Sequence, residues 1–244
     1  MASPFRTAAA VLGALVLLGA MYAIGIAATT RQRGGTTIVL VGLSATERSR
    51  EGEVATCARS AAARAIGRGA RLVIVPVART PVDMSTTPAD TRLPYVTRLD
   101  PWKATPQARK RLGRSADRRI AELLAREAPP GSSDQIAAAT IAYTEYADPS
   151  GDTSLIFCAD GHEVGPIDAF HDDLRPSRCR ALLARARPEM ADLHGATVVF
   201  GAAGQDILAH LPAARESQIR FFWTGCWAPA VNAHLPITYR LIAP

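Results

Sequence analysis

Short runs of β-branched and aliphatic residues recur along this chain, and stretches with helical character separate most of them. The runs cover residues 37–43, 71–77, 153–158, 197–201 and 237–242. Parallel strands need long, usually helical, crossover connections, so strands that alternate with helices predict a parallel sheet covered on both faces. We therefore expect an α/β fold: a doubly wound, mostly parallel, Rossmann-like sheet with helices on both faces.

Six helices are expected, and capping residues mark where two of them begin. They cover residues 51–66, 105–127, 134–146, 176–186, 205–211 and 218–227. Thr105 followed by Pro106 is typical of a helix start, and Ser132 and Ser133 are expected to cap the helix at 134–146. Residues 79–101 are expected to form a long loop with one short edge strand near 95–98.

The N-terminal segment has a different character. Residues 7–28 carry no charge, and arginines at 6, 31 and 33 bracket them. A bilayer-spanning helix needs about 20 apolar residues, whereas a signal-peptide core has roughly 7–15. We expect an uncleaved single-pass anchor with linker in residues 1–34 and the α/β domain in 35–244; the alternative is a signal cleaved after Ala27 or Ala28. The predicted location is the cell membrane. A short tail before a long apolar core usually stays inside while the domain after it is exported, which favours an extracytoplasmic domain; the alternative is a cytoplasmic domain, toward which the positive-inside rule alone leans.

Arginine dominates the net charge of +6. The stretch 107–127 is strongly basic and could meet anionic lipid or nucleic acid. No aromatic residue is interleaved there, and its apolar spacing serves ordinary packing. A solvated helix face is the favoured interpretation, and we expect no nucleic-acid partner.

The four cysteines, Cys57, Cys158, Cys179 and Cys226, form an even set. Outside the cytoplasm they could form two disulfides, with three pairings open. The alternative is buried free thiols, above all for Cys158, which lies in an apolar strand. Because no Cys-x-x-Cys or Cys/His ligand spacing occurs, we expect no zinc site.

Polar turns directly after the strands are the candidate ligand positions, since such sheets bind ligands beyond the carboxyl ends of their strands. Ser44 and Thr46 follow the first strand, Ser132 and Ser133 open a later helix, and Asp160 ends the strand of "SLIFCADG". This order resembles the von Willebrand factor A domain family over nearly all of residues 36–242. The family's adhesion site uses an Asp-x-Ser-x-Ser turn, a threonine at the head of a middle helix, and a later Asp-Gly.

The resemblance implies a binding or assembly module in which a carboxylate of a partner protein completes the shell of a metal ion. It places the metal ligands at Ser44, Thr46, Ser133 (or Ser132) and Asp160. Gly42 stands where the family has its leading aspartate. Mg²⁺ is usually held by one or two carboxylates, so a site left with Asp160 alone, unless Asp134 or Glu163 contributes, should bind Mg²⁺ weakly or not at all. No cofactor is otherwise expected, and Ser44 and Thr46 also suit ordinary capping.

Other clusters suggest chemistry less strongly. Asp168, His171, Asp172 and Asp173 could ligate a metal, with Asp168 and Asp172 sharing a helix face, although acids ahead of a helix are expected on dipole grounds alone. Ser44, Asp160 and His162 could be drawn as a triad, but no nucleophile elbow, Walker loop or dinucleotide fingerprint supports an enzyme.

The segment "FFWTGCW", residues 221–227, predicts core packing of the last helix, with an exposed partner patch as the alternative. We therefore expect a membrane-anchored, non-enzymatic module that binds a protein partner. The competing interpretations are a hydrolase or nucleotide-binding protein that uses the same rim, and a scaffold that works through its aromatic C-terminal helix.

Overall fold

The computed structural model describes residues 35–43, 51–77, 95–97, 105–125, 134–147, 152–159, 167–168, 171–201 and 211–235. All of them belong to one compact unit, Gly34–Pro244. The predicted helix at 205–211 lies almost wholly outside this part of the chain, and the predicted strand at 237–242 and the predicted anchor at 7–28 lie entirely outside it. No helix within the described ranges is long and apolar enough to cross a bilayer.

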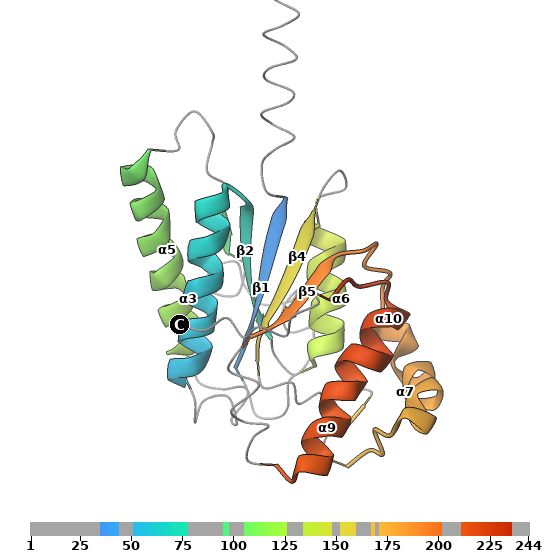
Figure 1. The fold of residues 1–244 in the computed structure, drawn as a ribbon. Helices are drawn as coiled ribbons and strands as arrows, with labels where there is room; N and C mark the ends of the chain where they lie inside the picture. Colours follow the sequence, from blue (N-terminus) through green and yellow to red (C-terminus); the bar gives the residue numbers. More distant parts are fainter. Residues whose placement is uncertain are drawn as a thin grey trace, which may run out of the picture. The chain divides into compact units, whose positions relative to one another are not determined.

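A five-stranded sheet forms the centre of the unit, in the order β3-β2-β1-β4-β5 (Figure 1). The strands are β1 (Thr36–Gly42), β2 (Arg71–Val77), β3 (Tyr95–Thr97), β4 (Thr153–Cys158) and β5 (Thr197–Phe200). The pairings β1–β2, β1–β4 and β4–β5 are parallel, and β3 is antiparallel to β2 at one edge. The α/β fold with a mostly parallel sheet is thus confirmed, together with the short edge strand.

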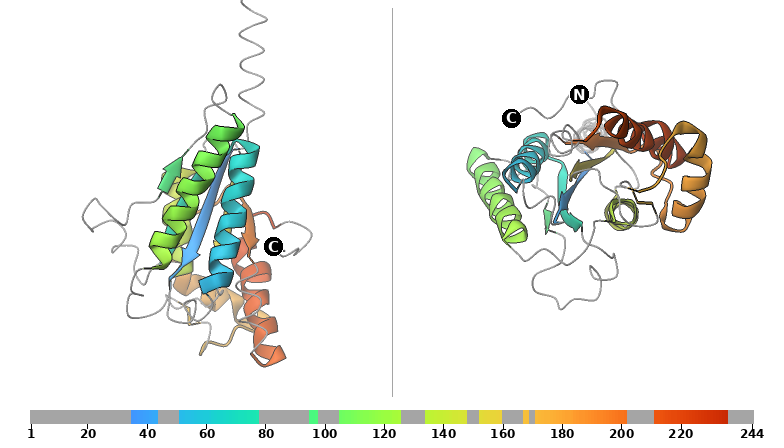
Figure 2. Two further views of the ribbon diagram at one scale, coloured as in Figure 1. Left: turned by 90° about the vertical axis from the view of Figure 1, so that its left-hand side faces the viewer. Right: turned by 90° about the horizontal axis from the view of Figure 1, so that it is seen from below.

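The central strands are apolar because both of their faces are covered. Every residue of β1 is buried, as is nearly every residue of β2. Helices α3 (Glu51–Arg68) and α5 (Pro106–Leu124) cover one face. Helix α6 (Gln135–Tyr146) and the C-terminal helices cover the other (Figure 2). Such two-sided burial explains runs of Val, Ile and Leu without polar alternation.

The helix starts test the capping predictions. Thr105 caps α5 as expected, because its Oγ1 accepts a hydrogen bond from the Ala108 amide at 3.1 Å. The prediction that Ser132 or Ser133 caps the next helix is wrong. Asp134 is the N-cap of α6, and its Oδ1 accepts from the Ala137 amide at 2.9 Å. A carboxylate also complements the helix dipole, which favours aspartate over serine at this position.

The C-terminal half packs short helices against the second face. They are η2 (Pro176–Arg178), α7 (Cys179–Ala186), η3 (Arg187–Glu189), α9 (Ala213–Phe221), the π-helical turn η4 (Phe222–Trp227) and α10 (Ala228–Ala230). The last helix therefore begins at Ala213 rather than at 218. Its first turns are polar and carry no apolar periodicity, so the sequence pattern missed them.

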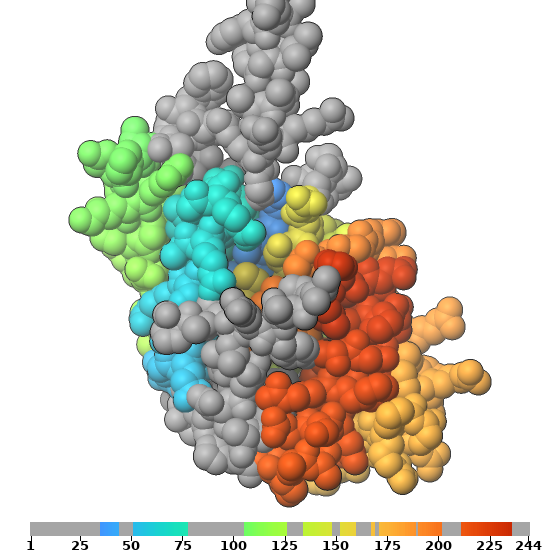
Figure 3. Space-filling view, viewed as in Figure 1, coloured from blue at the N-terminus to red at the C-terminus, as the bar shows by residue number. Residues whose placement is uncertain are grey.

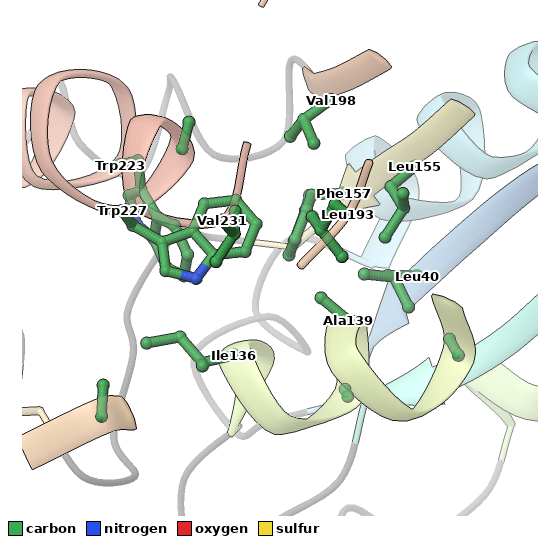
Figure 4. Packing of buried hydrophobic residues seen from close by; sticks show 14 of the residues in the cluster. Leu40, Ile136, Ala139, Leu155, Phe157, Leu193, Val198, Trp223, Trp227 and Val231 are labelled. Carbon is green, nitrogen blue, oxygen red and sulfur yellow. The ribbon is translucent and has the colours of Figure 1, made fainter. Parts of the chain in front are cut away.

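The aromatic segment at the end of this helix belongs to the core. Phe222, Trp223 and Trp227 are each at most 3% exposed. The ring of Phe157 in β4 meets Trp227 edge-on, with ring centroids 5.9 Å apart (Figure 4). Core packing is confirmed, and an exposed patch built on these three side chains is wrong.

Both cysteine pairs are joined, Cys57 to Cys158 and Cys179 to Cys226. The alternative of buried free thiols is therefore wrong. The first disulfide ties α3 to the end of β4, and the second ties α7 to η4. Each pair links elements that lie far apart in the sequence, by 101 and 47 residues.

Candidate binding face at the carboxyl edge of the sheet

The strand order reverses between β1 and β4. The chain runs from β1 outward through β2 to β3 and then returns to place β4 on the other side of β1. Val41 near the end of β1 pairs with Cys158 at the end of β4. We call the end of the sheet where β1, β4 and β5 finish the carboxyl edge, and the end where they begin the amino edge. In open α/β sheets ligands bind outside the carboxyl edge, at such a switch point.

Helices α3 and α6 both begin at the carboxyl edge. Helix α6 runs back from it, because the carbonyl of Tyr146 at its far end accepts a hydrogen bond from Arg71 at the start of β2, with Nη1 and O 3.2 Å apart. The two helix N-termini carry partial positive charge that acidic residues complement. Glu51 and Glu53 occupy the first turn of α3, and Asp134 caps α6. Asp134 therefore has a capping role already, which argues against its supplying the carboxylate missing at Gly42.

The floor of the carboxyl edge is closed by small and apolar side chains. Leu43 is 7% exposed, Ala159 3% and Cys158 0%. The residue after β5, Gly201, donates its amide to the carbonyl of Phe157 at 2.8 Å. A methyl group on Gly201 would overlap the sulfur of Cys57, so only glycine fits beside this disulfide. The described ends of β1, β4 and β5 are thus closely packed, with little space between them.

The predicted rim residues Ser44, Thr46, Ser132, Ser133 and Asp160 lie outside the described part of the chain, as do His162 and Glu163. Their immediate neighbours in sequence are described. Leu43 precedes Ser44, Ala159 precedes Asp160, and Asp134 follows Ser133. The structure brings these three neighbours to the same edge, while the ligand and metal assignments stay predictions.

The carboxylates of the acidic cluster at 168–173 form ion pairs, two of them with arginine. Residues 171–175 are not helical, so the expected helix is wrong here, although the amide of Asp172 donates to the carbonyl of Asp168 at 2.8 Å and brings the two residues together. Asp172 accepts hydrogen bonds from both terminal nitrogens of Arg185, at 2.9 and 2.5 Å. Those bonds hold the pKa of the Asp172 carboxyl below its usual range.

The other acids of this cluster are also engaged. Asp173 pairs with Arg175 at 2.6 Å, and Asp168 pairs with the ring of His171 at 2.7 Å. The hydrogen bond from Arg175 lowers the pKa of the Asp173 carboxyl. No group of three or more His, Cys, Asp or Glu suited to a metal occurs within the described ranges. Arg175 is two residues from Asp173 and could have been considered as its partner, whereas the sequence could not reveal Arg185, which lies 13 residues after Asp172.

Described residues line two of the hollows on the unit, and none of these residues belongs to the predicted rim. One, of about 560 Å³, is open to solvent beside the amino end of β5 and is lined by Asp192, His194, Asn232 and His234 among others. Asp192 accepts from the side chain of Asn232 at 2.8 Å and from the amide of His194 at 2.7 Å. These bonds lower the pKa of Asp192 and lock two turns together. No sequence signal joins residues 192 and 232.

The second hollow is a broad groove of about 1110 Å³ along α7. Leu183, Met190 and Ala230 contribute apolar surface to it, and Arg180 and Arg187 line it as well. The disulfide between Cys179 and Cys226 holds α7 in place beside this groove.

No known family model and no curated protein matches this chain.

Proposed function

We propose that this protein is a membrane-anchored, non-enzymatic binding or assembly module. Residues 7–28 would anchor it, and the rim at the carboxyl edge would hold a protein partner. The rim consists of Ser44, Thr46, Ser132, Ser133 and Asp160. The resemblance to von Willebrand factor A domains motivates this proposal, and the position of the switch point supports it.

The observation that carries the proposal is the closed floor of the carboxyl edge. Enzymes and nucleotide-binding proteins usually enclose their ligand in a concave pocket. Here the described residues at the ends of β1 and β4, Leu43, Cys158 and Ala159, are buried, and a disulfide joins Cys158 to α3. Loops mounted on a rigid frame are a common arrangement for presenting contacts to a macromolecular partner. This geometry favours a binding module over the alternative hydrolase or nucleotide-binding protein.

The two disulfides favour an extracytoplasmic location for the domain. They take up all four cysteines of the chain. Disulfides form and persist in oxidising compartments and are rare in the cytoplasm. The proposed topology therefore places the compact unit outside the cytoplasm.

The contact with the partner would not depend on a strongly bound metal ion. Gly42 supplies no charge, and the carboxylate of Asp134 serves the N-terminus of α6. Asp160 alone would leave half of the charge of Mg²⁺ uncompensated. The hydroxyls and Asp160 would instead donate and accept hydrogen bonds directly.

Site-specific photocrosslinking tests whether the rim contacts a protein partner. The full chain, in its native membrane, carries a photoreactive residue at Ser44 or Ser133, or at the control position Ala184, which is exposed on α7. We expect both rim positions to give the same discrete adduct, weakened by Asp160→Ala, and the control to give none. Adducts from Ala184 alone, or ATP binding abolished by the same rim substitutions, would contradict the proposal.

Calorimetry on the detergent-solubilised full chain tests whether the rim binds a metal ion. We expect Mg²⁺ and Mn²⁺ to bind the wild type only weakly, with Kd above about 1 mM. Gly42→Asp should tighten binding, and adding Asp160→Ala should remove the gain. Tight binding by the wild type would show that the site is complete without an aspartate at residue 42.

A further inference from the structure

The first half of α5 carries four exposed cations, Arg109, Lys110, Arg111 and Arg114. We call these four residues the basic face. Figure 3 shows α5 on the outer surface of the unit beside α3. The first turn of α5 contains no acidic residue.

The helix dipole does not account for these four charges. It is positive at the N-terminus of a helix, and its effect falls off within the first turn, so cations at these positions gain nothing from it. No hydrogen bond or ion pair to another described residue accompanies any of the four, whereas Arg119 further along the helix pairs with Glu122 at 3.4 Å. Folding of the described residues therefore gives no reason for four cations here. Binding to an anionic partner outside the chain would explain them.

The basic face lies at the amino edge of the sheet. Because β3 is antiparallel to β2, its last residue, Thr97, is opposite Leu72 near the start of β2. Helix α5 comes next in the chain and runs from the amino edge toward the carboxyl edge, alongside α3 in the opposite direction (Figure 1). The last turn of α3 adds exposed Arg68 at the same edge.

The chain tethers this edge to the anchor, an inference that rests on the membrane attachment proposed above. Residues 29–35 separate the apolar segment from the start of β1. A fully extended chain of that length spans about 25 Å at most. The amino edge would thus stay close to the bilayer surface. Acidic lipids in the leaflet that faces the unit would attract lysine and arginine side chains within about a Debye length.

We propose that the basic face binds the acidic phospholipid headgroups of the membrane that holds residues 7–28. Contact there fixes the orientation of the unit, with the amino edge toward the lipid and the carboxyl edge turned away from it. The partner-binding rim is then presented to the surrounding compartment.

The test uses the full chain in nanodiscs, one set of phosphatidylcholine alone and one with about a quarter phosphatidylglycerol. Lys110 is the reporter, and its acetylation by an uncharged reagent is followed by mass spectrometry. Arg180→Lys provides a reference amine on α7. We expect acetylation of Lys110 to slow about fivefold in the anionic discs, relative to the reference, and to recover in about 0.5 M salt.

Matched variants distinguish binding by the basic face from a general effect of the positive charge of the unit. Arg109→Gln with Arg111→Gln should abolish the protection of Lys110. Arg59→Gln with Arg187→Gln removes the same charge from exposed positions elsewhere and should leave the protection intact. Equal acetylation in both kinds of disc, or equal effects of the two pairs, would overturn the proposal.

Two further outcomes are distinguishable. Failure of the chain to stay with the discs on size exclusion would refute the anchor itself, and so the proposed function. Protection of Lys110 by an oligonucleotide but not by anionic discs would assign the basic face to nucleic acid and overturn the lipid contact.

Discussion

Replacing Gly201 by alanine tests how closely the end of β5 packs against the disulfide between Cys57 and Cys158. The added methyl group would overlap the Cys57 sulfur and would lie 3.0 Å from the carbonyl oxygen of Phe157. Gly201 does not have a positive φ, so its backbone conformation suits alanine. Any cost of Gly201→Ala therefore comes from packing.

The close packing around Gly201 sets the expected loss in the free energy of unfolding for Gly201→Ala. Overpacking a filled site costs about 1–3 kcal/mol. If Cys57→Ala and Cys158→Ala remove both sulfurs first, the main clash disappears. Gly201→Ala should then cost no more than about 1 kcal/mol, and could even stabilise the protein by restricting the unfolded chain. The coupling energy of the double-mutant cycle should be about 1–2 kcal/mol.

Removal of the disulfide has a cost of its own. Closing a loop of 101 residues is worth about 4.7 kcal/mol by the chain-entropy relation, and measured losses usually fall at 2–5 kcal/mol. The disulfide between Cys179 and Cys226, separated by 47 residues, should contribute about 4 kcal/mol by the same relation.

Urea unfolding of the unit Gly34–Pro244, followed by fluorescence of the buried Trp223 and Trp227, measures all four corners of the cycle. The double cysteine variant at 179 and 226 serves as the control background, because its disulfide does not contact Gly201. The cost of Gly201→Ala should be unchanged there. An equal cost in all three backgrounds would refute the argument that the sulfur of Cys57 requires a glycine at position 201.

Three further substitutions test local features. Thr105→Ala should destabilise the unit by about 1 kcal/mol, since it removes the cap of α5; no change in the urea midpoint would contradict that role. Gly225→Ala should cost about 1–3 kcal/mol, because the new Cβ would lie 2.5 Å from the ring of Phe221, and the thermal midpoint reports it. The folded-state pKa of Asp172 is lowered chiefly by the hydrogen bond from Arg185, so its stabilisation is present above a pH of about 3.9 and is lost as pH falls through the folded pKa. Asp172→Asn should remove about 1 kcal/mol at neutral pH and flatten the acid limb of stability against pH; an unchanged acid limb would refute the ion pair as its source.

The strands and most of the helices could be predicted because local patterns carry them. Apolar runs of β-branched residues mark strands buried on both faces, and β4 has the predicted boundaries. Thr105 followed by Pro106 marked the start of α5 because capping depends on neighbouring residues alone. The start of α9 was missed because its first turns present no apolar stripe, and Asp134 was passed over for the serines before it.

The candidate site could also be predicted only in part. The order of residues along the chain suggested a site with hydroxyls and an aspartate, and Gly42 showed that the leading carboxylate was missing. The closed floor beneath the rim could not be predicted, because it depends on Cys57, Cys158 and Gly201 meeting from three different elements.

The amino-acid sequence by itself determined the alternation of strands and helices, the apolar segment at 7–28, and the even set of cysteines, because each is a property of composition or short-range spacing. Only the tertiary structure decided which cysteines pair, which arginines neutralise the acidic cluster, and that the basic face lies at the amino edge. The disulfides join residues 101 and 47 positions apart, and the Arg185–Asp172 pair joins residues 13 apart, so chain folding sets these contacts and no local pattern records them.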